Sequence, residues 1–280
     1  MARIVVGVDE SEGAAAALRW AAEEGRLRGR PVTAVLAWTY LDQHGATPGS
    51  FDPKYGAEDA RTALDGILSG VLGSTAADAI DREVVCDLAA PALLGVATEE
   101  DLVVVGARGM GGFRELLLGS VSQQLLHHAP CPVAVVRTAG RSGGEGGIVV
   151  GVDGSPPSRR ALAWAVEEGR LRSAVVTVVH ARDPGDAAET AEAVLDAALE
   201  GVDVTGLPAP LERRLVTGGP APAILEIAHD AQLVVVGSRG GGGFAGLVLG
   251  SVSQHVTHHA RCPVVVMRAA GEARSDPATS

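Results

Sequence analysis

The amino-acid sequence predicts a tandem of two α/β domains, each built around a parallel β-sheet. The first observation is that three segments occur twice in the same order: Ile-Val-Val-Gly-Val-Asp at residues 4–9 and 148–153, Glu-Glu-Gly-Arg-Leu-Arg at 23–28 and 167–172, and Cys-Pro-Val at 131–133 and 262–264. The second is that short β-branched runs alternate with helical patterns, which is typical of βαβ units. Two copies of roughly 130 residues exclude a solenoid, which needs three or more shorter repeats.

The expected strands of the first copy are short runs rich in valine, isoleucine and leucine. They cover residues 4–8, 32–37, 82–86, 102–105 and 133–136. The run at 102–105 is entirely apolar, which indicates a strand that is buried on both faces of the sheet. The fifth run closes the first domain.

Helical patterns follow or separate these strands, at residues 11–27, 57–72, 91–98 and 120–128. Ser11 is the predicted N-cap of the first helix, because a serine hydroxyl can accept a hydrogen bond from the N–H groups of a helix start. Pro91 stands near the start of the third helix, where a missing N–H is tolerated. The second copy repeats this order of strands and helices.

The two copies differ in length at one place. The offset between equivalent residues falls from 144 (Ile4 to Ile148) to 131 (Gly106 to Gly237), so the first copy has thirteen extra residues. They fall around residues 43–55, which contain glycine and proline and are interpreted as a surface loop that covers a site.

Domain bounds follow from the repeat and from glycine content. We place the first domain at residues 1–138 and the second at 148–269. Residues 139–147 are dominated by glycine and are interpreted as a flexible linker, and residues 270–280 as a frayed tail. Each domain is long enough to bury a core of its own.

One glycine pattern, G-x2-G-x9-G-[ST], occurs in each copy. It is formed by Gly106, Gly109, Gly119 and Ser120 in the first copy and by Gly237, Gly240, Gly250 and Ser251 in the second. Each pattern lies between an apolar strand and a helix, where backbone N–H groups gather and can hold phosphate. A single loop of this kind is often only a tight turn, but two matching copies favour two nucleotide sites.

The basic residues exclude one common kind of nucleotide site. Lys54 is the only lysine, which excludes a Walker A loop with its Gly-Lys-[Ser/Thr] ending. Phosphate charge would therefore be balanced by backbone dipoles, by a divalent cation and by Arg108 or Arg239 within the loops. The second loop also fits the dinucleotide fingerprint G-x-G-x-x-G, but it follows the fourth strand instead of the first, which argues against a dehydrogenase.

The composition of the chain indicates which partners and which cellular compartment to expect. The formal net charge of −11 argues against a nucleic-acid surface, and no apolar run approaches the roughly 20 residues of a membrane span. A strand beginning at Ile4 leaves no room for a signal peptide, and three cysteines without C-x2-C spacing indicate a reducing compartment. We therefore expect a cytoplasmic protein without nucleic-acid or membrane partners.

The chain resembles the universal stress protein family, in its tandem two-domain form and its ATP-binding subgroup. The likeness rests on Gly-Val-Asp at the end of the first strand, Trp20 and Trp164 in the first helices, both glycine patterns and both Cys-Pro-Val endings, in the same order. It implies an open five-stranded parallel sheet with helices on both faces in each domain, Rossmann-like and of the adenine nucleotide alpha hydrolase type. It also implies one ATP at the carboxyl ends of the strands in each domain, and the lack of lysine near its phosphates predicts that Mg²⁺ accompanies them.

Nucleotide-binding residues are carried over from this resemblance position by position. In the first domain they are Gly7, Asp9, Ala37, Gly106, Ala107, Arg108, Gly109, Met110, Gly111, Gly112, Gly119, Ser120 and Val121. In the second they are Gly151, Asp153, Ala181, Gly237, Ser238, Arg239, Gly240, Gly241, Gly242, Gly243, Gly250, Ser251 and Val252. Glu10 replaces the usual glycine that Gly154 provides in the second copy, and a carboxylate near phosphates would make the first site the weaker one.

Other conspicuous residues have structural interpretations. The pairs His127-His128 and His258-His259 end short helices and are not at metal-ligand spacing. Trp20 and Trp164 are expected in the core, and Cys131 and Cys262 as small buried residues. No catalytic constellation is evident, so any ATP hydrolysis is expected to be slow.

Two functions remain open. The preferred one is a nucleotide-dependent stress regulator, in which ATP changes the surface offered to an unidentified protein partner. The alternative is a structural or assembly protein that pairs through residues 133–136 and 264–267 as edge strands, with nucleotide incidental. The resemblance suggests such pairing between the two domains of one chain, and a possible homodimer of chains.

Overall fold

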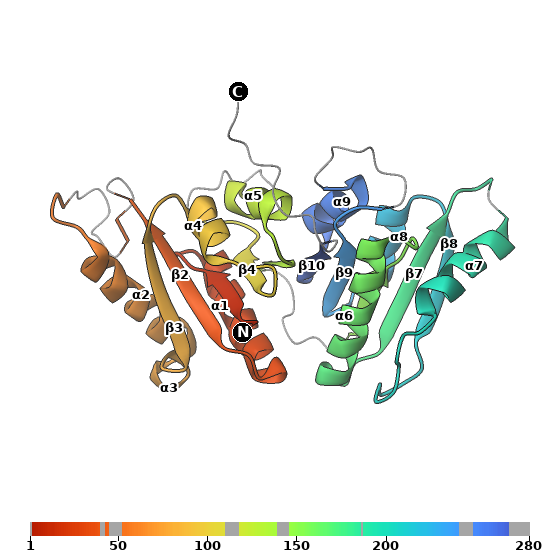
Figure 1. The fold of residues 1–280 in the computed structure, drawn as a ribbon, viewed down its shortest axis with the longest axis horizontal. Helices are drawn as coiled ribbons and strands as arrows, with labels where there is room; N and C mark the ends of the chain where they lie inside the picture. The colour runs from red at the N-terminus through yellow and green to blue at the C-terminus, as the bar shows by residue number, and fades with distance from the viewer. Residues whose placement is uncertain are drawn as a thin grey trace, which may run out of the picture. The chain divides into compact units, whose positions relative to one another are not determined.

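The computed structural model describes residues 2–39, 43–44, 52–109, 118–138, 146–185, 187–240 and 249–268. The chain divides into two compact units: unit 1 comprises Met1–Leu125 and Cys131–Thr138, and unit 2 comprises Leu126–Pro130 and Ala139–Ser280. Both units are α/β (Figure 1), which confirms the predicted fold class. The bounds of the linker stay a prediction, because residues 139–145 lie outside the described part of the chain.

Unit 1 contains a parallel sheet in the order β3-β2-β1-β4-β5. Its strands are β1 (Ile4–Gly7), β2 (Val32–Trp38), β3 (Ile80–Cys86), β4 (Leu102–Gly106) and β5 (Val133–Val136). Its helices are α1 (Glu12–Arg28), α2 (Ala57–Leu72), α3 (Ser74–Ala77), α4 (Ala89–Val96) and α5 (Ser120–His128).

The strand order of unit 1 creates a switch point beside β1. From β1 the chain moves outward to β2 and β3, and it then returns to β4 and β5 on the other side of β1. Because crossovers between parallel strands are right-handed, the two directions place their helices on opposite faces of the sheet. The helix α1 packs on β1 and β4, and α4 packs on β1 and β2. Ligands of such sheets bind at the carboxyl ends of the two central strands, where the connections that follow these strands run to opposite faces of the sheet.

Unit 2 repeats this arrangement in the order β8-β7-β6-β9-β10, again with parallel pairing. Its strands are β6 (Ile148–Gly151), β7 (Val176–Arg182), β8 (Glu212–Thr217), β9 (Leu233–Gly237) and β10 (Val264–Met267). Its helices are α6 (Pro156–Arg172), α7 (Ala188–Leu199), α8 (Pro220–Ile227) and α9 (Ser251–His259).

Most predicted elements are confirmed, and four of them, α2, α5, β5 and β10, have the predicted bounds. The short helix α3 was not predicted. The helix α4 begins two residues earlier than predicted, since Pro91 occupies its third position, where the N–H has no partner within the helix. The strand β4 includes Gly106, which was predicted to begin the loop.

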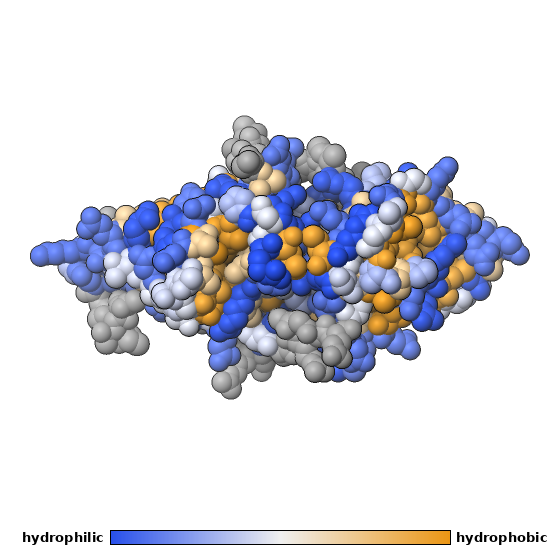
Figure 2. All heavy atoms as spheres, turned by 90° about the horizontal axis from the view of Figure 1, so that it is seen from below, coloured by the Kyte–Doolittle hydropathy of each residue, from blue (hydrophilic) through white to orange (hydrophobic). Residues whose placement is uncertain are grey.

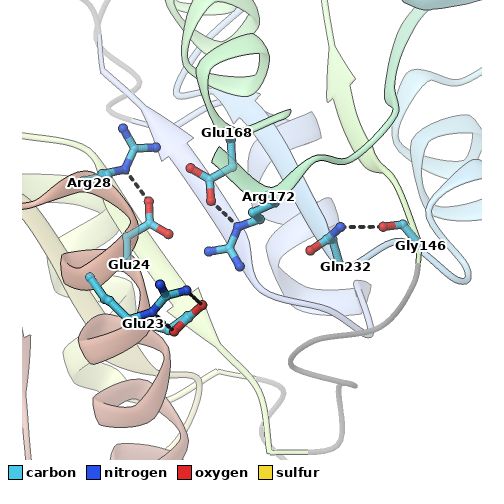
Figure 3. A network of polar contacts seen from close by, with 8 residues as sticks. Glu23, Glu24, Arg28, Gly146, Glu168, Arg172 and Gln232 are labelled. Carbon is cyan, nitrogen blue, oxygen red and sulfur yellow. Dashed lines mark hydrogen bonds and ion pairs between the residues drawn. The ribbon is translucent and has the colours of Figure 1, made fainter. Parts of the chain in front are cut away.

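The repeated hexapeptide Glu-Glu-Gly-Arg-Leu-Arg has a structural explanation. Glu24 and Glu168 are completely buried, and each accepts a hydrogen bond from the arginine one turn later, Arg28 in α1 and Arg172 in α6 (Figure 3). A buried carboxylate is costly without a paired cation, so the spacing of four residues within each helix is needed.

Core predictions are confirmed with one exception. Trp20, Cys131 and Cys262 are buried, whereas Trp164 is only half-buried, so the two equivalent tryptophans differ. On the face drawn in Figure 2, hydrophilic residues are interspersed with hydrophobic ones. No helix among the described residues combines the length and the hydropathy that crossing a bilayer requires.

The residue that follows the helix is glycine after α1 and serine after α6. Gly29 follows α1 with φ 60°, and Ser173 follows α6 with φ 51°, so both adopt the left-handed conformation. This conformation is unfavourable for serine, because its Cβ approaches the carbonyl oxygen, but not for glycine.

We expect Ser173→Gly to raise the free energy of unfolding of unit 2 by about 0.5–1 kcal/mol. The reverse change at the equivalent position, Gly29→Ser, should lower that of unit 1 by a similar amount. Urea unfolding of both variants measures the two shifts. Shifts of the same sign in the two variants would show that the left-handed conformation at these positions does not decide the stability.

Candidate functional site

A cavity of about 650 Å³ lies at the carboxyl ends of the central strands of unit 1. It extends from the end of β2, past the end of β1, to the loop after β4 and the start of α5. Nine predicted residues line it: Gly7, Asp9, Ala37, Gly106, Arg108, Gly109, Gly119, Ser120 and Val121. Ligand cavities in proteins commonly measure about 300–1,000 Å³, so this one is large enough for a mononucleotide.

Unit 2 has a cavity of about 470 Å³ at the equivalent place. The predicted residues that line it are Gly151, Asp153, Ala181, Gly237, Arg239, Gly240, Gly250, Ser251 and Val252. The repeat therefore brings the same residue types together twice, from segments that are far apart in each half of the sequence.

Two predicted residues, Ala107 and Ser238, lie behind the cavity walls. The N–H of Ala107 donates to Val136 (2.7 Å), and its carbonyl accepts from the N–H of Gly119 (2.8 Å). Ser238 bonds in the same way to Met267 and Gly250 (both 2.7 Å). These bonds fasten both ends of each glycine loop to the sheet. The other predicted residues, Met110, Gly111, Gly112, Gly241, Gly242 and Gly243, lie outside the described residues.

The start of α5 faces the unit 1 cavity. The N–H of Gln123 makes an intrahelical hydrogen bond back to Gly119 (3.1 Å), so the amides before it belong to the helix start, whose N–H groups have no intrahelical partners. Ser120, Val121 and Ser122 line the cavity there. In unit 2, Gln254 bonds to Gly250 in the same way (3.0 Å). Each cavity thus has one end suited to an anion.

One glycine of the first pattern, Gly106, is required by packing against backbone, and a second, Gly109, lies close to the end of a side chain. A Cβ on Gly106 would lie 2.5 Å from the backbone carbon of Gly13 in α1, and one on Gly109 would lie 2.7 Å from Oδ2 of Asp9. Gly119 differs, since a Cβ there would meet no atom closer than 3.5 Å and its φ is not positive. Neither packing nor conformation therefore requires glycine at 119, beside the helix start.

The aspartates that follow β1 and β6 hold the turns into α1 and α6. Oδ1 of Asp9 accepts from the N–H of Ser11 (2.9 Å). Oδ1 of Asp153 accepts from both the N–H (3.0 Å) and the hydroxyl (2.6 Å) of Ser155. Ser11 in turn caps α1 by accepting from the N–H of Ala14 (3.1 Å), as predicted. These carboxylates therefore have a structural role, and both also line their cavities.

Arginines line both cavities, and an acidic residue lies beside the first one. Arg108 and Arg239 line their cavities, as predicted. Glu10 is exposed and does not line this cavity, but it lines an adjoining hollow toward α2 that shares Asp9, Ser11 and His44 with the cavity. The lower affinity expected of the first site therefore stays a prediction.

Sequence reasoning missed several lining residues. They are Ser11, Thr39, His44, Asp87, Leu88 and Leu93 in unit 1, and Ser158, Pro220, Ile224 and Ser253 in unit 2. Ser122 was missed as well. The hydroxyls of Ser122 and Ser253 each lie within hydrogen-bonding distance of two carbonyl oxygens at the ends of their loop, those of Gly119 (2.9 Å) and Ala107 (3.3 Å) in unit 1. Comparing the copies could have found these two, because Gly-Ser-Val-Ser-Gln occurs in both.

The histidine pairs stand at the ends of α5 and α9. Within the described ranges, no group of three or more His, Cys, Asp or Glu side chains could hold a metal ion. Burial of the His127 ring lowers its pKa, and charge interactions with His128 and Arg268 lower it further. The neutral ring is thus favoured, so His127 is poorly suited to interact as a cation with the end of its helix.

Comparison with known proteins gives one consistent result. The sequence model of the Universal stress protein family matches residues 1–137 and again residues 147–268. A universal stress protein of Mycolicibacterium smegmatis is 35% identical over 283 residues, with 95% of this chain and 96% of that protein covered. One from Mycobacterium tuberculosis is 34% identical over 287 residues, with the same coverage. The crystal structure of a universal stress protein from Archaeoglobus fulgidus shares the fold, with a TM-score of 0.70, 21% identity and coverage of 95% and 98%.

Proposed function

Because this chain belongs to the universal stress protein family, we propose that it binds ATP in each unit and acts as a nucleotide-dependent stress regulator. One observation carries the proposal: equivalent places in the two units each combine a cavity, a fastened glycine loop and a helix start. Gly119 supports it further, because its missing side chain leaves room for a phosphate where the protein itself needs none.

The proposed pose places the triphosphate at the helix start. Backbone N–H groups and the hydroxyl of Ser120 would donate to phosphate oxygens in unit 1, as those of Ser251 would in unit 2. Arg108 and Arg239 would add positive charge. The nucleoside would lie along β1 and β2, near Gly7, Asp9 and Ala37 in unit 1.

We propose that Mg²⁺ binds mainly to the phosphate oxygens of ATP. The cation commonly keeps several waters and binds few protein groups when phosphate oxygens are available, so it does not need a ready protein cluster. It would reduce the charge of the triphosphate in a chain with a single lysine. We propose no catalytic residue, and we expect any hydrolysis of ATP to be slow.

A regulator also requires that ATP bind one state of the protein surface more tightly than another. We propose that the loops after β4 and β9 respond to ATP, since each borders its cavity and joins the sheet to the helix start. An unidentified protein partner would bind the surface of the ATP-bound state and that of the ATP-free state with different affinities. The cytoplasm is the proposed location.

We expect native mass spectrometry of the full chain with ATP and Mg²⁺ to show two nucleotides per chain, with lower occupancy when EDTA is present. The same samples, treated with a protease, should be cut more slowly with ATP than without it. Absence of bound nucleotide at millimolar ATP would overturn the binding proposal. Two bound nucleotides with unchanged cleavage would overturn the regulatory part alone.

A further inference from the structure

The two units differ most in the connection between their second strand and second helix. In unit 1, residues 39–56 connect Trp38 to Ala57, whereas in unit 2 only residues 183–187 connect Arg182 to Ala188. Trp38 and Arg182 are equivalent in the repeat. The extra residues of unit 1 therefore begin directly beside the β2 end of its cavity.

The described part of this connection is fastened at three points. The side-chain amide of Gln43 and the backbone of Asp52 exchange two hydrogen bonds, of 2.7 and 2.9 Å. The buried Tyr55 donates its hydroxyl to the carbonyl of His44 (2.9 Å) and packs edge-on against Trp38, with ring centroids 5.6 Å apart. The backbone at His44 is thus held in place from both sides.

His44 forms part of the cavity wall. Its residue surface is 5% exposed, and its Nε2 lies 3.1 Å from the carbonyl oxygen of Ala37, which also lines the cavity. A carbonyl oxygen can only accept, so this nitrogen carries a proton and donates. The same end of the cavity contains the buried side chains Val35 and Leu93.

The two ends of the unit 1 cavity therefore suit different chemical groups. The start of α5 suits an anion, while the β2 end presents aliphatic side chains, a backbone carbonyl and an aromatic ring. A planar base fits this second end, because an imidazole can pack against a ring.

We propose that His44 positions the nucleobase in unit 1, by fixing the carbonyl of Ala37 and by offering its ring to the base. This inference rests on the proposed nucleotide binding. It makes the two sites of one chain unequal, because unit 2 reaches α7 through a connection too short to supply an equivalent residue. His44 is a positioning residue that acts on the base and not on the phosphates.

The experiment uses calorimetric titration of the full chain carrying Ser251→Asp, which places a negative charge at the phosphate end of the unit 2 cavity. His44→Ala is expected to weaken ATP binding to unit 1 by about fivefold. Binding of inorganic tripolyphosphate, which has no base, should not change. In the reciprocal background Ser120→Asp, His44→Ala should leave the affinity of unit 2 for ATP unchanged.

A second variant, Tyr55→Phe, removes only the hydroxyl that holds the backbone of His44. It should weaken ATP binding in the same direction without affecting tripolyphosphate, and it carries the test if His44→Ala fails to fold. Equal loss of both ligands, or loss of neither, would overturn the role of His44. Failure of the Ser251→Asp parent to bind ATP would instead overturn nucleotide binding by unit 1, on which this inference rests.

Discussion

Replacing Ser120 and Ser251 by aspartate is expected to abolish ATP binding without lowering the stability of the protein. Both serines are exposed and occupy the first positions of α5 and α9. A carboxylate there would stand beside the proposed phosphates. Two unit charges about 4 Å apart repel by roughly 1 kcal/mol in water and 4 kcal/mol at an effective dielectric of 20, and a triphosphate carries several charges. We expect affinity to fall by at least about a hundredfold at each site.

The effect on stability should have the opposite sign. A negative charge in the first turn of a helix interacts favourably with the helix dipole, typically by about 0.3–1 kcal/mol at an exposed position. Thermal unfolding of the protein without nucleotide should therefore be unchanged or shifted slightly upward. A substitution that damaged the fold would instead lower both stability and binding, so the two measurements separate the explanations.

The asparagine variants Ser120→Asn and Ser251→Asn are the matched controls. Asparagine has nearly the shape of aspartate and also favours helix starts, but it carries no charge. We expect these variants to keep most of their ATP affinity. Each single aspartate should leave one ATP per chain, because the other unit keeps an unaltered helix start. Undiminished ATP binding by the double aspartate variant would place the phosphates elsewhere.

The fold and much of the cavity wall could be predicted because the sequence contains each of them twice. Local patterns identified β4 and β9 as buried strands, and the glycine pattern marked the loop after each. Gly119 and Ser120 could be predicted from their position in the chain alone. They stand where the loop ends and α5 begins, and both border the cavity.

The residues that were missed come from elements that only the sheet topology brings near. Asp87 and Leu93 belong to the segment after β3, a strand that is not adjacent to β1, and they reach the cavity because α4 packs back across β1 and β2. His44 lies in the connection that the second copy lacks, so comparing the copies could not assign it a role. The effect of Glu10 on the first site stays a prediction, because Glu10 borders a hollow that shares Asp9, Ser11 and His44 with the cavity.

The glycines show a related difficulty. The pattern predicted phosphate contact, but a Cβ on Gly106 or Gly109 would collide with the protein itself. The partner in the first contact, Gly13, stands outside the pattern and had no recognisable signal in the sequence. Its position matters because α1 lies against the backbone of Arg108 there.

Gly13→Ala is expected to destabilise unit 1 by about 1–3 kcal/mol, the usual cost of overpacking. Gly13 is buried in the first turn of α1, and a Cβ on it would lie 2.1 Å from the carbonyl oxygen of Arg108. Either α1 or the loop must shift, and backbone on both sides limits the movement. Because the loop also lines the cavity, ATP binding to unit 1 should weaken as well, while unit 2 remains unaffected.

The same substitution at Gly70 is the matched control. Gly70 lies in α2, and a Cβ there would meet nothing within 4 Å, so alanine should stabilise that helix by about 0.5–1 kcal/mol. Denaturant unfolding followed by tryptophan fluorescence reports on unit 1 for both variants when Trp164 of unit 2 is replaced by phenylalanine, because only Trp20 and Trp38 then remain. The two changes should thus differ in sign although the chemistry of the substitution is identical. If Gly13→Ala were as stable as Gly70→Ala, the close approach of α1 to the loop could not be what fixes this end of the cavity.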